Sequence, residues 1–157
     1  MPASQETAPM IRIEPCQSAH QAGWLSLRQA LWPDCPAEEH LEEMRSLLDD
    51  PRRYINLLAY TADGQPVGLA EASLRRDYVN GTEHSPVVFL EGLYVAAEQR
   101  RQGIAERLID AVAQWGREHG CVEMASDTGL ENLLSQTVHK ALGFEETERV
   151  VYFRKTL

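Results

Sequence analysis

The sequence predicts an α/β (α+β) fold in which a mixed, twisted β-sheet is flanked by helices. Short apolar runs with strand-like patterning alternate along the chain with segments that repeat apolar residues at helical spacing. The dipeptide Asp63-Gly64 lies between two of the strand-like runs and is a strong hairpin signal. The 157 residues are enough for one domain with a buried core. We expect a disordered leader over residues 1–9 and a single domain over residues 10–157.

The first third of the chain predicts one strand and two helices. MIRIEP (10–15) alternates apolar and polar residues as a half-buried strand does. Ser18 and Gln21 have the spacing of a capping box, which predicts a helix from there to Pro33. A second helix is predicted over 36–49, because proline suits its first turn and an apolar stripe follows.

The middle of the chain predicts three strands, one of which is central to the sheet. Two antiparallel strands within 54–75 surround the turn ADGQP. The polar, turn-rich stretch 75–86 is typical of an exposed loop. PVVFLEGLYV (86–95) is almost continuously apolar, which predicts a central strand buried on both faces.

The last third predicts two helices and two strands. Apolar residues recur at helical spacing between Gly103 and Gly120, and CVEMAS (121–126) indicates a short buried strand. Residues 131–143 predict a helix, and 144–157 a closing strand. The apolar face of the helix at 131–143 comprises Leu134, Val138 and Leu142. The expected order of elements is β-α-α-β-β-β-α-β-α-β.

Charge and cysteine content restrict the partners and the compartment. The net charge of −9 argues against nucleic acid, whose binding needs clustered Lys and Arg, and favours a cationic ligand. A merely solvating acidic surface is the alternative. The widely spaced Cys16, Cys35 and Cys121 indicate reduced thiols rather than a metal site. The chain starts without a secretory signal and has no run approaching ~20 apolar residues, so we expect a cytoplasmic protein without a membrane partner.

EQRRQGIA (98–105) joins the apolar strand to the longest helix and has the properties of an anion cradle. A helix N-terminus carries unpaired N–H donors and partial positive charge. Gly103 and Ala105 lack bulk, so a pyrophosphate has room to approach the backbone, and Arg100 and Arg101 add charge. Taken alone, the stretch fits a solvated basic turn before a helix equally well.

Its pattern identifies a family. Residues 100–105 match Q/R-x-x-G-x-G/A after a strand, and the pattern N-x-x-x-x-x-x-H-x-x-L-G-F follows at 132–144. The chain therefore resembles the GNAT superfamily of acetyl-CoA-dependent N-acetyltransferases. LWPDCP, RRDYVNG, SPVVFLEGLYV, MASDT and HKALGFEETERVVYFRK also resemble segments of the bacterial aminoglycoside 6′-N-acetyltransferases of type I.

The resemblance implies a site for acetyl-CoA and needs no metal. The backbone of the central strand, with Leu93 and Val95, holds the pantetheine and polarises the thioester. The pyrophosphate is held by Arg100, Arg101, Gln102, Gly103, Ile104 and Ala105. Asn132 bonds the pantetheine arm or, alternatively, caps its helix. Gly92 is a bulge or a point of close packing.

The resemblance also implies roles in catalysis and in acceptor binding. Glu91 is the candidate base for the amine, since a carboxylate inside an apolar strand needs a partner or a purpose; an ion pair with Arg75 is the alternative. Asp127 is the candidate substrate carboxylate or a helix cap. Trp32 and Tyr78 line the acceptor pocket or are packed aromatics. His139 stands where many relatives have a tyrosine that protonates the thiolate, and is otherwise a satisfied helix residue.

The implied reaction is direct attack of an aminoglycoside 6′-amine on the thioester in a ternary complex, which confers resistance. A homodimer is the family expectation, with VVYF of the closing strand as one contributor. Two other functions stay open: acetylation of another small amine or a protein N-terminus, and a non-catalytic acyl-CoA-binding module.

Overall fold

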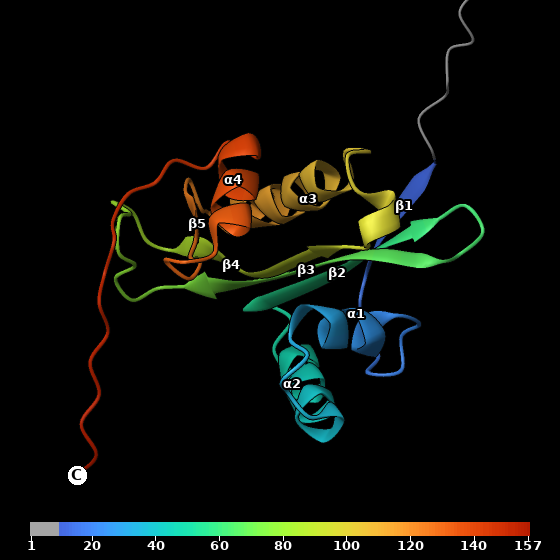
Figure 1. The fold of residues 1–157 in the computed structure, drawn as a ribbon, viewed down its shortest axis with the longest axis horizontal. Helices are drawn as coiled ribbons and strands as arrows, with labels where there is room; N and C mark the ends of the chain where they lie inside the picture. The colour runs from blue at the N-terminus through green and yellow to red at the C-terminus, as the bar shows by residue number, and fades with distance from the viewer. Residues whose placement is uncertain (1–9) are drawn as a thin grey trace, which may run out of the picture.

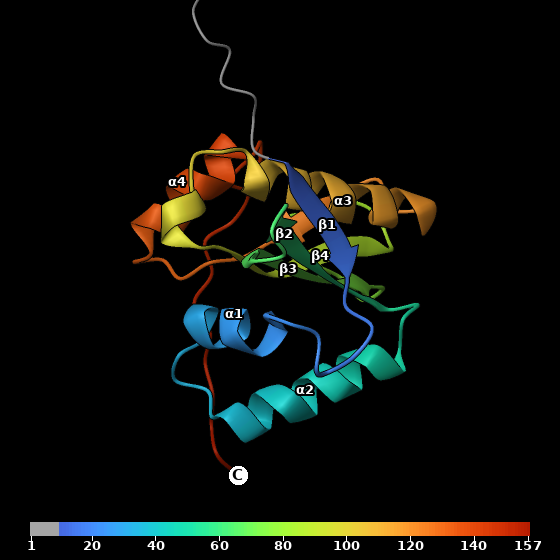
Figure 2. The ribbon, with the colours of Figure 1, turned by 90° about the vertical axis from the view of Figure 1, so that its right-hand side faces the viewer.

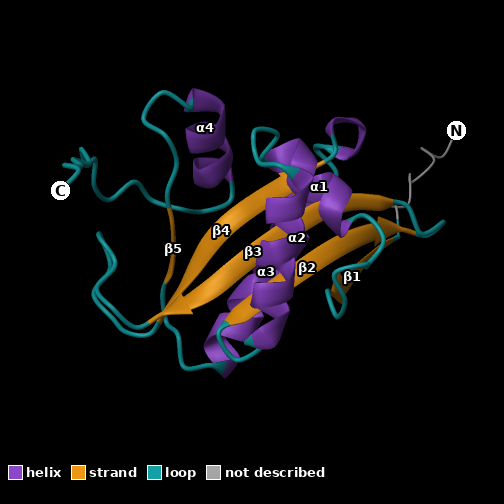
Figure 3. Cartoon of the chain, turned by 90° about the horizontal axis from the view of Figure 1, so that it is seen from below, coloured by secondary structure: helices purple, strands orange, loops and turns teal. Residues whose placement is uncertain are grey.

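The computed structural model describes residues 10–157, in which five strands form one mixed sheet in the order β1-β2-β3-β4-β5. The expected leader at 1–9 lies outside the described residues. Neighbouring strands from β1 to β4 are antiparallel, and β5 is parallel to β4 (Figure 3). The strands are β1 (Ile11–Pro15), β2 (Tyr54–Thr61), β3 (Pro66–Arg75), β4 (Val87–Val95) and β5 (Met124–Ser126).

Helices cover both faces of this sheet (Figures 1 and 2). On one side lie α1 (Trp24–Leu31) and α2 (Ala37–Asp49), and on the other α3 (Ile104–Glu118) and α4 (Leu133–Ala141). A short 3-10 turn, η1 (Ala97–Gln99), leads from β4 into α3. The mixed α/β class and the order of the predicted elements up to α4 are thereby confirmed.

Local sequence explains where the elements begin and turn. The β2–β3 hairpin turns at Gly64, whose φ of 84° lies in the region that favours glycine. The prediction that helix one starts at the Ser18–Gln21 capping box was wrong by several residues. Ser18 forms a separate turn. Gly23 has a left-handed backbone conformation (φ 89°), which separates that turn from the helix, so α1 starts at Trp24.

Two apolar clusters hold the helices to the sheet. Ala70, Ala72 and Leu74 on one face of β3 pack in a cluster that includes Leu108 and Val112 of α3. On the opposite face of the sheet, Leu58 of β2 and Leu69 of β3 belong to a second cluster. Its members on the helices are Trp24, Leu27 and Met44 of α1 and α2. Alternating residues of β3 thus face different helix layers, as the pleat of a strand requires.

A buried polar group lies among the apolar residues of the α1–α2 side. Glu71 of β3 is 4% exposed and accepts hydrogen bonds from Trp24 Nε1 (2.8 Å) and from the guanidinium of Arg28, itself 2% exposed. Burial raises the pKa of Glu71 above its ordinary value, and Arg28 and Trp24 act against that rise. Arg28 also pairs with Glu43 and donates to His40 Nδ1 (3.1 Å), so this group ties α1 and α2 to the sheet.

The predicted closing strand at 144–157 was wrong. These residues form no strand, and the end of the chain extends away from the sheet (Figure 1). Val151, Tyr152 and Phe153 are exposed, Phe153 at 93%. The physical reason is that a strand needs a partner for its backbone groups, and within the chain this segment is not placed beside β5.

Two smaller predictions about burial, one for β4 and one for α4, were wrong because no neighbouring element covers these residues. β4 is buried on both faces only over residues 87–90, whereas Glu91 is exposed and the next three residues are half-buried. The predicted apolar face of α4 is not in the core, and Leu134 is 70% exposed. No helix within residues 10–157 has both the length and the apolar character needed to cross a membrane.

Candidate functional site

The central geometric feature is the point where β4 and β5 separate. Their parallel ladder has three residue pairs and ends at Leu90 and Ser126. β4 continues to Val95, so its side facing β5 has no strand partner over residues 91–95. Apart from the Val95 C=O, which accepts from Arg100 Nε, the backbone N–H and C=O groups on that side are available to a ligand, because polar backbone groups otherwise require a partner or water. Leu93 and Val95 lie in this part of β4.

A β-bulge lies at the same point. On the β3 side of β4, Ala72 pairs with Leu90 and Glu71 with Gly92, which leaves Glu91 as the extra residue. The expected bulge is present, and so is the close packing given as its alternative: a Cβ on Gly92 would lie 2.6 Å from the Trp32 ring. The close approach of the Trp32 ring is what requires glycine there.

Glu91 faces the layer of α1 and α2 and is held in place by β3. Its carboxylate accepts a hydrogen bond from the Ser73 hydroxyl (2.6 Å) and pairs with Arg75 (2.9 and 3.2 Å). The Arg75 guanidinium in turn stacks 3.5 Å from the centre of the Phe89 ring. The ion pair with Arg75 is therefore present, and about a third of the Glu91 side chain remains open to solvent.

Trp32 follows α1 and is fixed by the buried polar group. The Arg28 guanidinium lies 4.9 Å from its ring, and His40 Nε2 donates to its backbone oxygen (3.2 Å). The donor must be Nε2–H because Nδ1 already accepts from Arg28. Trp32 lines a shallow pocket of about 450 Å³ together with the carboxylates of Asp34 and Glu43.

The turn before α3 forms an open cradle. Arg101 (φ 63°) and Gly103 (φ 77°) both have left-handed backbone conformations, and Gly103 is the N-cap of α3. A Cβ on Gly103 would meet nothing within 4 Å, so the space in front of the helix N-terminus is free for an anion. This arrangement fits a pyrophosphate. Any other residue at 103 would place a side chain in that space and strain the backbone.

One side chain of the cradle holds the turn in place, and two others are exposed to a ligand. Arg100 Nε donates to the Val95 backbone oxygen (2.9 Å), which ties the turn to the end of β4. Arg101 and Gln102 are exposed, whereas Ile104 is buried in the core and Ala105 is half-buried. Ile104 and Ala105 therefore offer a ligand only their backbone N–H groups.

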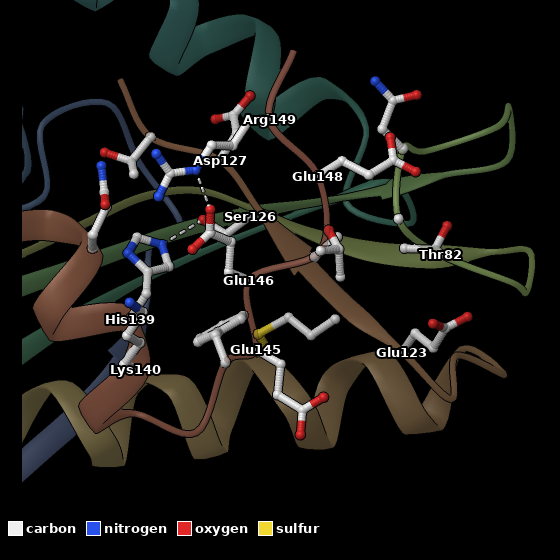
Figure 4. A pocket seen from close by; sticks show the side chains of 18 of the residues that line it. Thr82, Glu123, Ser126, Asp127, His139, Lys140, Glu145, Glu146, Glu148 and Arg149 are labelled. Carbon is white, nitrogen blue, oxygen red and sulfur yellow. Dashed lines mark hydrogen bonds and ion pairs between the residues drawn. The ribbon is translucent and has the colours of Figure 1, made fainter. Parts of the chain in front are cut away.

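On the α4 side of the gap, His139 meets Ser126 (Figure 4). His139 Nε2 lies 2.8 Å from Ser126 Oγ, and Nδ1 lies 2.7 Å from the Ser135 backbone oxygen. Phe144 packs edge-on against the imidazole at 5.3 Å. Asn132 accepts from Ser135 N (3.1 Å), so its side chain caps α4, the alternative given for it.

Asp127 lies in a second, larger pocket of about 1000 Å³ beside β5 (Figure 4). β5, α4, the loop at 80–82 and residues 144–152 line this pocket, which takes in five carboxylates. One of them, Glu123, accepts bonds from the backbone N–H groups of Glu83 and His84 and from the His84 ring, which lowers its pKa. The five carboxylates are Glu123, Asp127, Glu145, Glu146 and Glu148.

The structure brings together some of the predicted residues and separates others. Glu91, the unpaired part of β4, the cradle and His139 surround one gap. Asp127 shares its pocket with Ser126 and His139, whereas Trp32 lines a different pocket. Tyr78 is 77% exposed on its loop and lines neither pocket. Among residues 10–157 no group of three or more His, Cys, Asp or Glu is arranged to hold a metal ion.

Sequence reasoning missed the residues that position this site. Ser73 contacts Glu91, and Ser126 contacts His139. Arg28, which pairs with Glu71, holds the ring of Trp32 in place. Glu71 had a usable signal, because it interrupts the apolar run VGLAEASL in the same way that Glu91 interrupts FLEGLYV. Ser126 had none, since serines at strand ends are common.

This fold and this site define an acetyltransferase, and similarity to known proteins supports the same class. The chain belongs to the acetyltransferase (GNAT) family, whose model matches residues 24–144.

The chain is similar to aminoglycoside 6′-N-acetyltransferases over nearly its whole length. It is 53% identical over 142 residues, 90% of this chain and 97% of the relative, to an aminoglycoside N(6′)-acetyltransferase type 1 of Serratia marcescens. The crystal structure of aminoglycoside antibiotic 6′-N-acetyltransferase AAC(6′)-Ih from Acinetobacter baumannii superimposes with a TM-score of 0.89 at 48% identity, covering 94% of this chain and 99% of that one. AAC(6′)-Iy in complex with the bisubstrate analogue CoA-S-monomethyl-acetylneamine gives a TM-score of 0.88 at 47% identity, with the same coverage.

Proposed function

We propose that this protein transfers the acetyl group of acetyl-CoA to the 6′-amine of aminoglycoside antibiotics and so confers resistance to them. The observation that carries the proposal is the gap between β4 and β5, with a bulged carboxylate on one side and an anion cradle at its end. The aminoglycoside specificity is supported by relatives about half identical over nearly their whole length. The catalytic unit in this proposal is the single domain 10–157.

Acetyl-CoA is held in this proposal mainly by backbone groups. The pyrophosphate lies at the cradle, against the N–H groups at Gly103, Ile104 and Ala105, with Arg101 and Gln102 at its open side. The pantetheine follows the unpaired side of β4 at Leu93 and Val95, and the thioester reaches the point where the strands separate. Arg100 serves by tying the turn to β4, and Asn132 by capping α4 near the pantetheine.

Glu91 is the proposed base. Aminoglycoside amines are mostly protonated near neutral pH, and only the neutral amine attacks, so a carboxylate must take up the proton directly or through one water. The hydroxyl of Ser73 and the guanidinium of Arg75 orient Glu91 and leave part of it open towards the acceptor. Deprotonation beside the thioester allows attack in a single ternary complex.

The cysteines give no support to an acetyl-enzyme. Cys16 and Cys121 are buried, and burial raises the pKa of each thiol, as it also does for Cys35. A raised pKa keeps these sulfurs as poorly nucleophilic thiols. The acetyl group therefore passes directly from sulfur to nitrogen.

Carboxylates and aromatic rings bind the acceptor in this proposal. Asp127 takes a second ammonium of the antibiotic, supported by Glu145 and Glu148 of the same pocket, whereas Glu146 is paired with Arg149 and Glu123 is held by the loop at 83–84. Trp32, beside Glu91 on the α1 side, offers a ring face to an aminosugar, and the exposed Tyr78 ring is available from the loop at 76–86. His139 stands at the leaving-group side of the gap.

We also propose that the enzyme is a cytoplasmic homodimer. Cytoplasmic location is supported by three free thiols. The dimer is supported by residues 150–157, whose large apolar side chains are exposed in an extended segment, and by the open outer edge of β5 with a wide pocket beside it. The proposed occupant of that edge is the same segment of a second copy, which satisfies the backbone of both strands.

Changing one apolar side chain of this segment tests the dimer. We expect Phe153→Asp to give a monomer in analytical ultracentrifugation, because a charge on the buried side of the new strand has no partner. Thr156→Asp, which adds the same charge to a polar position of the segment, serves as the control and should remain dimeric. A dimeric Phe153→Asp protein would contradict this interface.

Gly103→Ala tests the cradle. We expect the dissociation constant of acetyl-CoA to rise about tenfold or more, since a methyl group at φ 77° occupies the anion space and strains the backbone. Gly120→Ala is a matched control, because Gly120 follows the other end of the same helix with φ 84° and equally open surroundings. Calorimetry should show unchanged acetyl-CoA binding for that control, and equal effects of the two variants would refute the cradle.

A kinetic test with amide variants addresses the reaction itself. With acetyl-CoA and kanamycin or tobramycin, we expect wild-type protein to release CoA and Glu91→Gln to lower kcat about 100-fold. Asp127→Asn should raise the aminoglycoside KM about tenfold, because it removes one charged hydrogen-bond acceptor. Asp110→Asn, at an exposed position on α3, is the control and should match wild type. A wild-type preference for a linear polyamine, or full activity of both site variants, would contradict the proposal.

A further inference from the structure

The contact between Ser126 and His139 links β5 to α4 at the point where β4 and β5 separate. Both side chains are half-buried, and they join the end of β5 to the last turn of α4. Ser126 is the last residue of β5 and the last partner of β4 in the ladder. The hydroxyl therefore lies where the gap between the two strands opens, opposite Glu91, which directly follows Leu90 on the other strand.

The hydrogen bonds of the imidazole fix its direction of proton transfer. Nδ1 lies 2.7 Å from the Ser135 backbone oxygen, which only accepts, so Nδ1 carries a hydrogen. Nε2 at 2.8 Å from Ser126 Oγ is thus an acceptor in the neutral ring and a donor in the charged ring. In the charged ring Ser126 Oγ accepts from Nε2, and its own proton is free to point elsewhere.

Ser126, rather than His139, reaches the gap. Its Oγ lies 3.4 Å from the backbone oxygen of Leu90, its partner in the last pair of the ladder, so the hydroxyl lies at the edge of the gap between the strands. The imidazole lies behind it, with both nitrogens occupied and Phe144 against its ring at 5.3 Å. Any proton that His139 gives to a group between the strands passes through Ser126.

We propose that Ser126 is the residue that protonates the departing thiolate, with His139 as the proton source behind it. This inference rests on the proposed acetyl transfer. When the C–S bond breaks, the Ser126 O–H proton moves to sulfur, and the Nε2 proton of charged His139 moves to Ser126 Oγ. The products are neutral imidazole, an intact serine hydroxyl and the free thiol of CoA. The ammonium loses one proton before the attack and a second when the tetrahedral intermediate collapses; both leave on the other side, in succession, through Glu91 to solvent, and solvent recharges His139.

Binding of CoA without any acceptor provides the first test. The probes are CoA and desulfo-CoA, in which hydrogen replaces the thiol. We expect wild-type protein to bind CoA about tenfold more tightly than desulfo-CoA, and Ser126→Ala to bind the two equally, because the hydroxyl no longer contacts the sulfur. Thr137→Ala, which removes another hydroxyl of the α4 region, should keep the wild-type preference.

Turnover provides the second test. We expect Ser126→Ala to lower kcat about 100-fold while the KM for acetyl-CoA changes little, since the contact with sulfur matters most when charge develops on it. His139→Gln keeps a hydrogen-bonding group near Ser126, but its amide cannot act as an acid. This variant should lower kcat to a similar extent. The double variant should be no slower than either single variant, because the two residues act as one unit. Thermal unfolding of each variant checks that the fold is intact.

Two results would overturn the relay. One is a Ser126→Ala protein that keeps the preference for CoA over desulfo-CoA. The other is independent effects of Ser126→Ala and His139→Gln that multiply in the double variant. Failure of the proposed function is distinguishable, because it appears as wild-type protein that acetylates no aminoglycoside, and the binding comparison still decides the role of Ser126.

Discussion

The early end of the β4–β5 ladder is the constraint on which the rest of the site depends. Three residue pairs hold the two strands together, and beyond Leu90 and Ser126 the side of β4 that faces away from β3 has no strand partner over residues 91–95. Polar backbone groups require partners, so this side of β4 is preformed to bind an extended ligand such as pantetheine. The bulge that places Glu91 at the same point adds a carboxylate to that surface.

Each face of the sheet supplies a different half of the proposed chemistry. On the α1–α2 side, β3 orients Glu91, and the buried Arg28–Glu71 pair holds Trp32 against the bulge at Gly92. On the α3–α4 side lie the helix N-terminus at the cradle and the imidazole behind β5. A proton is removed on one side of the gap and delivered on the other, which keeps the base and the acid apart. Such separation prevents the two groups from neutralising each other.

Sequence patterns predicted the elements whose stability is local. Helical periodicity, the Asp63-Gly64 turn and the glycine before α3 all act within a few residues, and each appears where expected. The closing strand failed because 144–157 needs a partner edge that no local pattern supplies. The same limit applies to the site. The candidate Glu91 was visible as a charge in an apolar run, whereas the Ser126 contact depends on two elements meeting in space.

Backbone hydrogen exchange in β4, measured with and without acetyl-CoA, tests the central claim most directly. If the unpaired side of β4 holds the cosubstrate, the amides of residues 91–95 that face away from β3 will exchange more slowly on binding, as will the first amides of α3. Amides already paired in the β2–β3 hairpin will change little. Slowed exchange confined to other parts of the chain, with β4 unaffected, would contradict the account.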